Sequence, residues 1–112
     1  ERIDVAHCGL LPAAQLAPMT RVQIARDRAM AEVVAAAREP GRTVLLITGG
    51  GHVHRTLGVP RHLPPELRAS VLLALAGGAP AAGRGDGLQM DDQVWSTAPL
   101  PPHDPCAPLR RP

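Results

Sequence analysis

The sequence predicts an α/β fold with a partial, mostly parallel sheet flanked by helices. A helical pattern over residues 12–38 is followed, after Pro40 and Gly41, by a continuous apolar run at residues 43–48 and then by three glycines. A helix, a short loop, a buried strand and a glycine loop in this order indicate an α/β unit. The unbroken apolar run is typical of parallel sheets, whose strands are covered on both faces.

The chain begins with helical segments. Residues 3–8 form a short apolar segment that ends at Cys8-Gly9, and glycine commonly ends a helix. From residue 12 onward the apolar positions are spaced by three or four, as on one helix face. Because a proline inside a helix removes a hydrogen bond and clashes with the preceding turn, we expect Pro18 to break or kink this stretch. The predicted helix therefore covers residues 19–38.

The later elements are shorter. Residues 43–48 (Thr-Val-Leu-Leu-Ile-Thr) predict a strand buried on both faces, and residues 52–58 predict a short helix or turn. Residues 66–75 contain helix formers as well as a Val-Leu-Leu centre, so helix and strand compete there. The remainder is predicted to comprise a rigid loop at 59–65, a strand at 69–76, a flexible turn at 77–87, a short edge strand at 94–97 and an extended proline-rich tail from 99.

Length and composition limit the function. The 112 residues suffice for one domain or part of one, and they are 45 % hydrophobic with one Trp and no Phe or Tyr. Binding of single-stranded nucleic acid by base stacking needs aromatic side chains. A formal charge of +2 without a cationic stripe does not fit a phosphate-backbone binder. We therefore expect no nucleic acid partner. The chain has no apolar run of about 18 residues, so we also expect no membrane span.

The segment Gly49-Gly50-Gly51-His52, directly after the predicted strand, is the strongest candidate for chemistry. Ligands of α/β proteins bind beyond the carboxyl ends of the strands, where glycines allow close backbone approach. The segment is not a dinucleotide fingerprint, since His54 stands at the third glycine position. It is not a P-loop, since no Gly-Lys-Ser/Thr follows. His52 is therefore either at the functional edge of a sheet or a loop histidine bonded to backbone.

Histidine spacing gives a metal site little support. His52 and His54 diverge on a helix and converge only in an extended segment. His7 and His62 are further candidate ligands, but no His-Glu-x-x-His or Cys-x-x-Cys pattern accompanies them. His52 remains the candidate for metal binding.

The predicted helix carries a polar group close to its apolar stripe. Gln23, Asp27 and Met30 fall on one face, with Arg26 alongside. Polar groups that lie so close to a core need partners. We therefore expect Arg26 or Asp27 to form an ion pair with the sheet loops. The alternative is a solvated polar face.

Cys8 and Cys106 are the two cysteines, and an even count permits a disulfide without proving it. If they pair, loop closure contributes about 4 to 5 kcal/mol in the chain-entropy model, and the compartment is oxidising. A proline-rich tail with little apolar surface gains order only when it is tethered, which favours the pairing.

Five short motifs follow one another along the chain. They are His7-Cys8-Gly9 with Leu10-Leu11-Pro12; Gln23, Arg26, Asp27, Met30 and Ala31; Gly49, Gly51, His52 and Val53; Gly58-Val59-Pro60 with Leu63; and Val94-Trp95 and Thr97 with Asp104-Pro105-Cys106. In this order they resemble the ChaN-like haem-binding uptake family of bacterial lipoproteins, in the superfamily of the erythromycin esterases and Tiki proteases. The family's domain is longer, and the chain is similar to its C-terminal half. Because the chain opens on Glu1 without an initiator Met, we expect a piece of a larger protein.

The resemblance implies the C-terminal part of a ChaN-like domain at residues 1–98 and a tail tethered by Cys106 at 99–112. It implies a haem-binding protein of bacterial iron acquisition, not an enzyme, exported to the periplasm or the outer membrane. A lipid anchor outside this segment would be its membrane contact, and a homodimer is a further expected partner. The alternative is a metal-dependent hydrolase of the superfamily, using His52 with Arg26 and Asp27. Both cysteines lie in matched motifs, which supports the disulfide.

The resemblance places haem, with its iron, at the Gly49–His52 segment. Haem iron takes an axial His, Tyr, Cys or Met. Because the chain has no Tyr, the candidates in order are His52, His54 and His7, or a ligand outside the chain.

Other groups complete the expected haem site. Gly49 and Gly51 lie in the matched motif, and Arg55 or Arg61 would pair with the propionates. Two positions depart from the family pattern, since Gly50 stands where Asn is usual and His54 where Arg is common.

Overall fold

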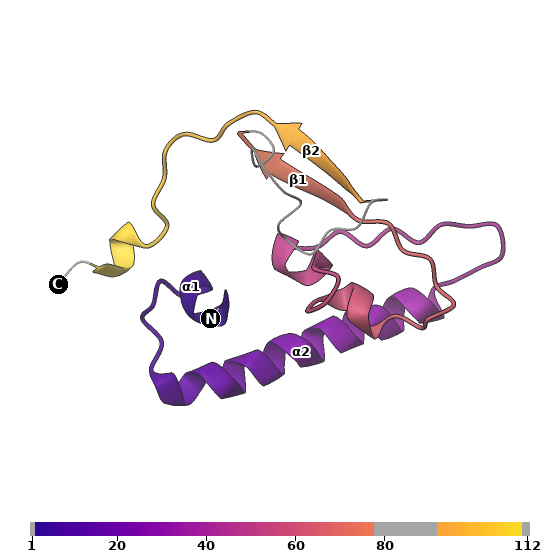
Figure 1. The fold of residues 1–112 in the computed structure, drawn as a ribbon, viewed down its shortest axis with the longest axis horizontal. Coiled ribbons are helices and arrows are strands. Elements are labelled where there is room, and N and C mark those ends of the chain that lie inside the picture. The colour runs from indigo at the N-terminus through magenta and orange to yellow at the C-terminus, as the bar shows by residue number, and fades with distance from the viewer. Residues whose placement is uncertain (1, 78–91, 111–112) are drawn as a thin grey trace.

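The computed structural model describes residues 2–77 and 92–110 (Figure 1). The elements are the helices α1 (Arg2–Ala6) and α2 (Ala13–Ala36), the 3₁₀ turns η1 (Gly50–Val53) and η2 (Val59–His62), the strands β1 (Leu72–Ala76) and β2 (Gln93–Thr97), and a last 3₁₀ turn, η3 (Ala107–Arg110). In Figure 1, α2 runs along one side and the strands lie on the other, with η1 and η2 between them. Helices combined with a parallel sheet confirm a partial α/β fold.

The first helix ends as its sequence predicts. Cys8 and Gly9 follow α1 with positive φ angles of 62° and 67°. The Gly9 N–H donates to the carbonyl of Asp4 at 2.9 Å, which closes the last turn. A left-handed ending of this kind suits glycine, which has no Cβ to clash with the following carbonyl.

Helix α2 is longer than predicted. It begins at Ala13 and contains Pro18, so the expected start at residue 19 is wrong. Pro18 lies in the second turn and removes one backbone hydrogen bond there, while the N–H groups of the first turn have no intrahelical partner in any case. The helix continues to Ala36, and the Ala37 N–H donates to the Val33 carbonyl at 3.0 Å.

The two strands predicted in the second half of the chain are present and pair in parallel. The register runs from Leu72 opposite Gln93 to Ala76 opposite Thr97. At the entry to the strands the Gln93 N–H donates to the Val71 carbonyl at 2.9 Å. The predicted turn at 77–87 lies outside the described residues except for Gly77, which follows β1 with a φ of 82°.

The strand predicted at residues 43–48 is wrong for the described structure. The segment forms neither a helix nor a paired strand, and the side chains of Leu45 and Ile47 are 80 % and 87 % exposed. A strand exists through hydrogen bonds to a neighbouring strand, and within residues 2–77 and 92–110 the sheet consists of β1 and β2. The apolar run therefore signals a need for burial that the described part of the chain does not meet.

The buried core is small. Among the described residues, the buried apolar side chains are Ala31 of α2, Val59 of η2 and Val71 before β1. Two carboxylates, Asp27 and Asp92, are buried with them. Turn η2 packs against α2, which brings the loop after η1 onto the same helix. In the described ranges no helix is long and apolar enough to cross a bilayer.

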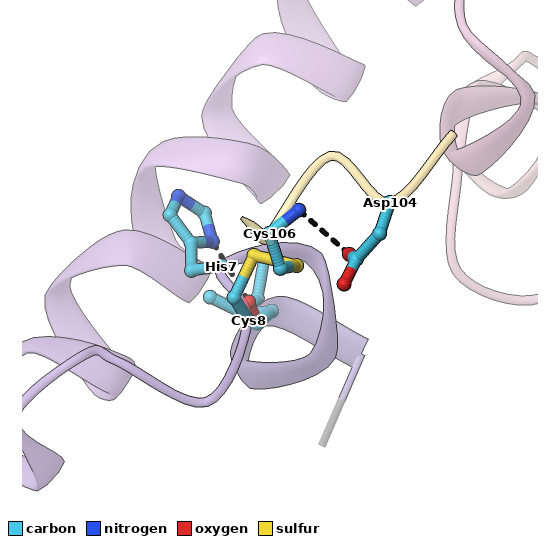
Figure 2. The surroundings of a disulfide bond; sticks show 5 residues. His7, Cys8, Asp104 and Cys106 are labelled. Carbon is cyan, nitrogen blue, oxygen red and sulfur yellow. Dashed lines mark hydrogen bonds between the residues drawn. A yellow bond between two sulfur atoms is a disulfide. The ribbon is translucent and has the colours of Figure 1, made fainter. Parts of the chain in front are cut away.

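A disulfide joins Cys8 to Cys106, with 98 residues of sequence separation and Cα atoms 5.7 Å apart (Figure 2). Beside it, the Cys106 N–H donates to Asp104 Oδ1 at 2.9 Å. The expected pairing is thus present in the structure. It attaches the tail, which is extended after β2 as predicted and then forms the unexpected turn η3, to the end of α1.

Candidate functional site

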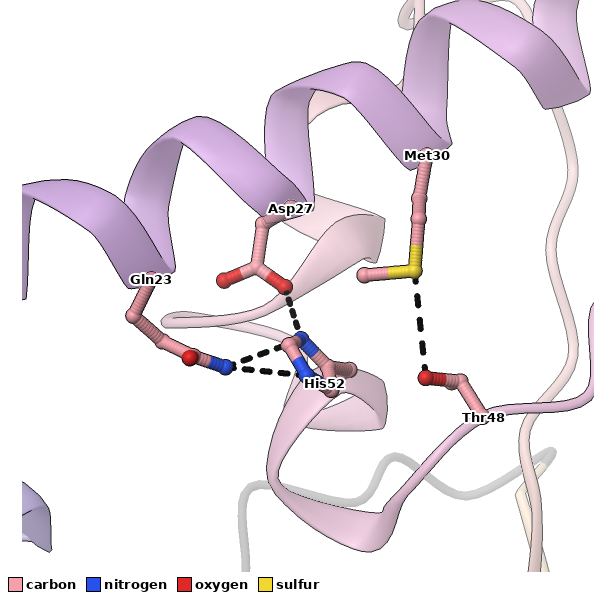
Figure 3. Close-up of polar contacts among 5 residues, drawn as sticks. All are labelled: Gln23, Asp27, Met30, Thr48 and His52. Carbon is pink, nitrogen blue, oxygen red and sulfur yellow. Dashed lines mark hydrogen bonds and ion pairs between the residues drawn. The ribbon is translucent and has the colours of Figure 1, made fainter.

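A buried carboxylate of α2 holds His52 (Figure 3). The His52 Nδ1–H donates to Asp27 Oδ1 at 2.5 Å. The Asp27 side chain is 4 % exposed and the His52 side chain 20 % exposed. A carboxylate removed from water needs such a donor. With Nδ1 protonated toward Asp27, the neutral imidazole keeps its lone pair on Nε2.

The amide of Gln23 lies beside the same ring. Its Nε2 is 2.9 Å from His52 Nε2 and 3.1 Å from His52 Nδ1. A donor in line with the Nε2 lone pair would be much farther from Nδ1, because the second nitrogen lies across the ring. The nearly equal distances therefore show that Gln23 contacts the ring from the side and does not block the lone-pair direction of Nε2.

Helical spacing explains why these groups meet at His52. Gln23, Asp27 and Met30 are separated by four and three residues, so α2 presents them on one face. Met30 extends the group, because its Sδ accepts a hydrogen bond from Thr48 Oγ1 at 3.8 Å (Figure 3). Arg26 is exposed on another face and does not take part. Of the two residues expected to reach the loops, Asp27 does so, through its hydrogen bond with His52.

The turn that carries His52 is fixed by a close backbone contact. A Cβ on Gly58 would lie 2.1 Å from the backbone oxygen of His52, which no side chain tolerates. The Gly58 N–H also donates to the His54 carbonyl at 2.7 Å. Gly58 is therefore required where the chain folds back over η1, and this contact sets the position of the His52 backbone.

The glycines before His52 are not required by the described fold. None of the three glycines, Gly49, Gly50 and Gly51, has a positive φ angle. A Cβ on Gly50 would meet Leu73 Cδ1 at 3.4 Å, an ordinary contact, and one on Gly51 would meet nothing within 4 Å. The backbone at Gly51 therefore leaves open space one residue before His52.

Arg55, expected to bind a ligand carboxylate, binds a carboxylate of this chain instead. Its Nε–H donates to Asp92 Oδ2 at 2.7 Å, and its Nη2 donates to the other oxygen of Asp92 and to the Ala69 carbonyl. Asp92 Oδ1 also accepts from the Val71 N–H at 2.9 Å. The side chains of Arg55 and Asp92 are 14 % and 0 % exposed. The loop after His52 is thus tied to the amino-terminal ends of β1 and β2.

The remaining candidate histidines lie elsewhere. His54 Nδ1 contacts the hydroxyl and the N–H of Thr56 at 3.1 and 3.4 Å. His7 Nδ1 donates to the Ile3 carbonyl at 2.8 Å beside the disulfide (Figure 2). The described residues contain no group of three His, Cys, Asp or Glu side chains that could hold a metal ion.

Two features of the site were not predicted from the sequence. Asp92 follows Asp91 in a polar segment, and nothing in the pattern indicates that it is buried or that it faces an arginine 37 positions earlier. Gly58 belongs to a recognised motif, but its role against the His52 backbone depends on the path of the loop. The burial of Asp92 could be predicted only if its partner, Arg55, were already known.

The first half of the chain matches a known family. Residues 1–63 match the family described as "Haem-binding uptake, Tiki superfamily, ChaN", a span that includes Gln23, Asp27 and His52 and ends before β1. No curated protein and no solved structure matches the chain significantly. Since the matched span exceeds half of the chain, the protein belongs to this ChaN family of haem-binding uptake proteins in the Tiki superfamily.

Proposed function

We propose that the protein binds haem for iron acquisition and that His52 Nε2 is the protein ligand of the iron. The observation that carries this proposal is the hydrogen bond from His52 Nδ1 to the buried Asp27 carboxylate. Histidines that bind metals usually donate their other ring N–H to a carboxylate or carbonyl, which fixes the tautomer and makes the ligating nitrogen more basic. Membership of the haem-binding uptake family supports the choice of haem.

The residues around His52 fit a haem group. The His52 side chain is partly exposed, Gln23 leaves the Nε2 lone pair in an accessible direction, and the open backbone at Gly51 allows a flat ligand to approach. Haem would supply the iron and its redox chemistry when bound. The role of the chain is to present a neutral imidazole nitrogen in a fixed orientation.

The propionate partner in this proposal is Arg61. Arg61 is an exposed residue of turn η2, and its Nη1 donates to the Thr56 carbonyl at 3.1 Å. Arg55 is already bound to Asp92 and Ala69 and has a structural task. His54 contacts Thr56, and His7 lies beside the disulfide, away from the glycine segment; neither is oriented by a buried carboxylate of the described residues, so both are the less suitable ligands.

The wider setting is part of the same proposal. Residues 1–98 form the C-terminal part of a haem-binding domain, and residues 99–112 form a tail tethered by Cys106. The protein is exported to the periplasm or the outer membrane, where a lipid anchor outside this segment and a second copy of the chain are its further contacts. The disulfide supports export, because disulfides persist in oxidising compartments.

Titration of the purified chain with hemin tests the iron ligand. We expect a shifted Soret band for the wild type, a shift that is lost or strongly weakened in His52→Ala, and an unchanged shift in His103→Ala, whose histidine is exposed on the tail. His54→Ala and His7→Ala are the tests of the other candidate ligands. A wild-type chain without a Soret shift would contradict haem binding, and a shift unaffected by His52→Ala would contradict the ligand.

A metal-dependent hydrolase remains the second candidate, because a carboxylate-oriented imidazole also serves as a general base. Such a site needs further metal donors at His52 beyond those that residues 2–77 and 92–110 provide. Metal analysis of the pure protein with an esterase and peptidase screen separates the candidates: stoichiometric metal with turnover that His52→Ala abolishes would favour the hydrolase.

A further inference from the structure

The turn that carries His52 is attached to the sheet by one buried ion pair. Arg55 lies three residues after His52 and two residues after the end of η1. Its guanidinium donates to Asp92 through both Nε and Nη2. Between His52 and Arg55 the chain has only two residues in which to absorb a displacement. With the guanidinium held by Asp92, this short connection limits how far the His52 backbone can move.

Asp92 is a fixed point for this attachment. Its carboxylate is fully buried and accepts the Val71 N–H at 2.9 Å, while the next residue, Gln93, donates to the Val71 carbonyl at 2.9 Å. The carboxylate is thus held by the same backbone that starts the parallel pair. A two-point contact with a planar guanidinium fixes direction as well as distance, which an ammonium group cannot do.

We propose that Asp92, acting through Arg55, is a positioning residue that aligns the His52 ring with Asp27 and thereby sets the tautomer and orientation of the ligating nitrogen. This inference rests on the proposed function. Three contacts then fix the turn: Asp27 on the ring, Gly58 on the His52 backbone and Asp92 on Arg55. Asp92 lies outside the span that matches the family, directly before β2, so the proposal extends the site to the C-terminal part of the chain.

The test compares this buried pair with an exposed one of the same chemistry. Arg55→Lys and Asp92→Asn keep the size of the side chains and remove the fork or the charge. Arg42→Lys and Glu39→Gln are the matched controls, because Arg42 Nη1 binds Glu39 Oε2 at 3.0 Å with side chains 75 % and 62 % exposed. Urea unfolding and amide NMR spectra identify any variant that loses the fold, and Arg55→Lys provides the milder change.

Two readouts then separate positioning from stability. The first is the imidazole ¹⁵N spectrum of the haem-free chain above neutral pH, in which we expect a single Nδ1–H tautomer for His52 in the wild type and both tautomers in folded Arg55→Lys or Asp92→Asn. The second is hemin titration, with affinity expected to fall about tenfold in these variants, as for other groups that orient a metal ligand. The two control variants should change neither readout.

The outcomes distinguish this inference from the proposed function. If the wild type does not bind hemin but the His52 tautomer changes in Arg55→Lys and Asp92→Asn, haem binding fails and the positioning role stands. If the His52 spectrum and the hemin affinity of the folded variants equal those of the wild type, the positioning role is overturned whether or not haem binds. An equal change in the control variants also overturns it.

Discussion

The structure is stabilised differently at the two ends of the molecule (Figure 1). At one end, α1 has no buried residue, and its link to the tail is the disulfide between Cys8 and Cys106. At the other end, the turns η1 and η2 lie between α2 and the strands and are fixed by the pairs Asp27–His52 and Arg55–Asp92. One end relies on a covalent bond, and the other on buried polar contacts.

This difference indicates where chemistry can reside. A disulfide limits the separation of two segments but leaves their side chains exposed to water. Buried ion pairs specify the direction of each group, because an unpaired charge away from water is strongly unfavourable. The end with buried pairs therefore provides a fixed imidazole, and the disulfide end provides attachment.

Removal of the disulfide is the largest expected change. Cys8→Ser with Cys106→Ser should lower the free energy of unfolding by about 4 to 5 kcal/mol in the chain-entropy model, because 98 residues separate the two positions. Urea unfolding measures the loss, and dithiothreitol should reproduce it in the wild type. The Soret shift with hemin should persist in variant protein that remains folded under native conditions. A loss of the shift in folded protein would contradict the separation of the two ends.

The two buried pairs should respond unequally to loss of their carboxylate. Asp92→Ala leaves the buried Arg55 without this carboxylate, and an arginine cannot give up its charge, so we expect a loss of about 3 to 5 kcal/mol in urea unfolding. Asp27→Ala removes the acceptor of one hydrogen bond from a neutral imidazole, so the loss should be only about 1 to 2 kcal/mol. Equal losses would show that the two pairs play the same structural part.

Two glycines near His52 provide the smallest and most local comparison. Gly58→Ala forces a Cβ against the His52 carbonyl and should cost about 1 to 3 kcal/mol. Gly51→Ala meets open space and should change stability by less than about 0.5 kcal/mol. The larger Gly51→Leu should instead weaken hemin binding while the unfolding curve stays close to that of the wild type. If Gly51→Leu binds hemin like the wild type, the ligand does not approach at this glycine.

Local patterns predicted the elements that form through local contacts. The helix around Gln23 and Asp27 follows from its apolar spacing, and the strands β1 and β2 follow from short branched apolar runs. The predicted strand at 43–48 fails because apolar composition indicates a segment that favours burial, whereas pairing depends on a neighbour far away in the sequence. The prediction that Pro18 interrupts the helix is wrong, because the cost of a proline depends on its place in the helix.

The candidate site was predictable in part. The i, i+4 spacing of Gln23 and Asp27 predicts a shared helical face, and the glycines point to His52. The pairing of that face with that histidine, 25 residues from Asp27, depends on how η1 packs against α2. The structural role of Arg55 was not predictable, because it depends on Asp92, whose burial no local pattern reveals.

By itself, the sequence determined the helix with its polar face, two short strands in the second half of the chain, the glycine segment before His52 and membership of the family. Tertiary structure alone decided that Asp27 rather than Arg26 reaches His52, that Arg55 is bound to Asp92 and that residues 43–48 remain unpaired. The physical reason is the distance along the sequence over which each interaction acts. Periodicity and turn chemistry act over a few residues, whereas the cost of burying a charge is met only by a partner that folding brings from elsewhere in the chain.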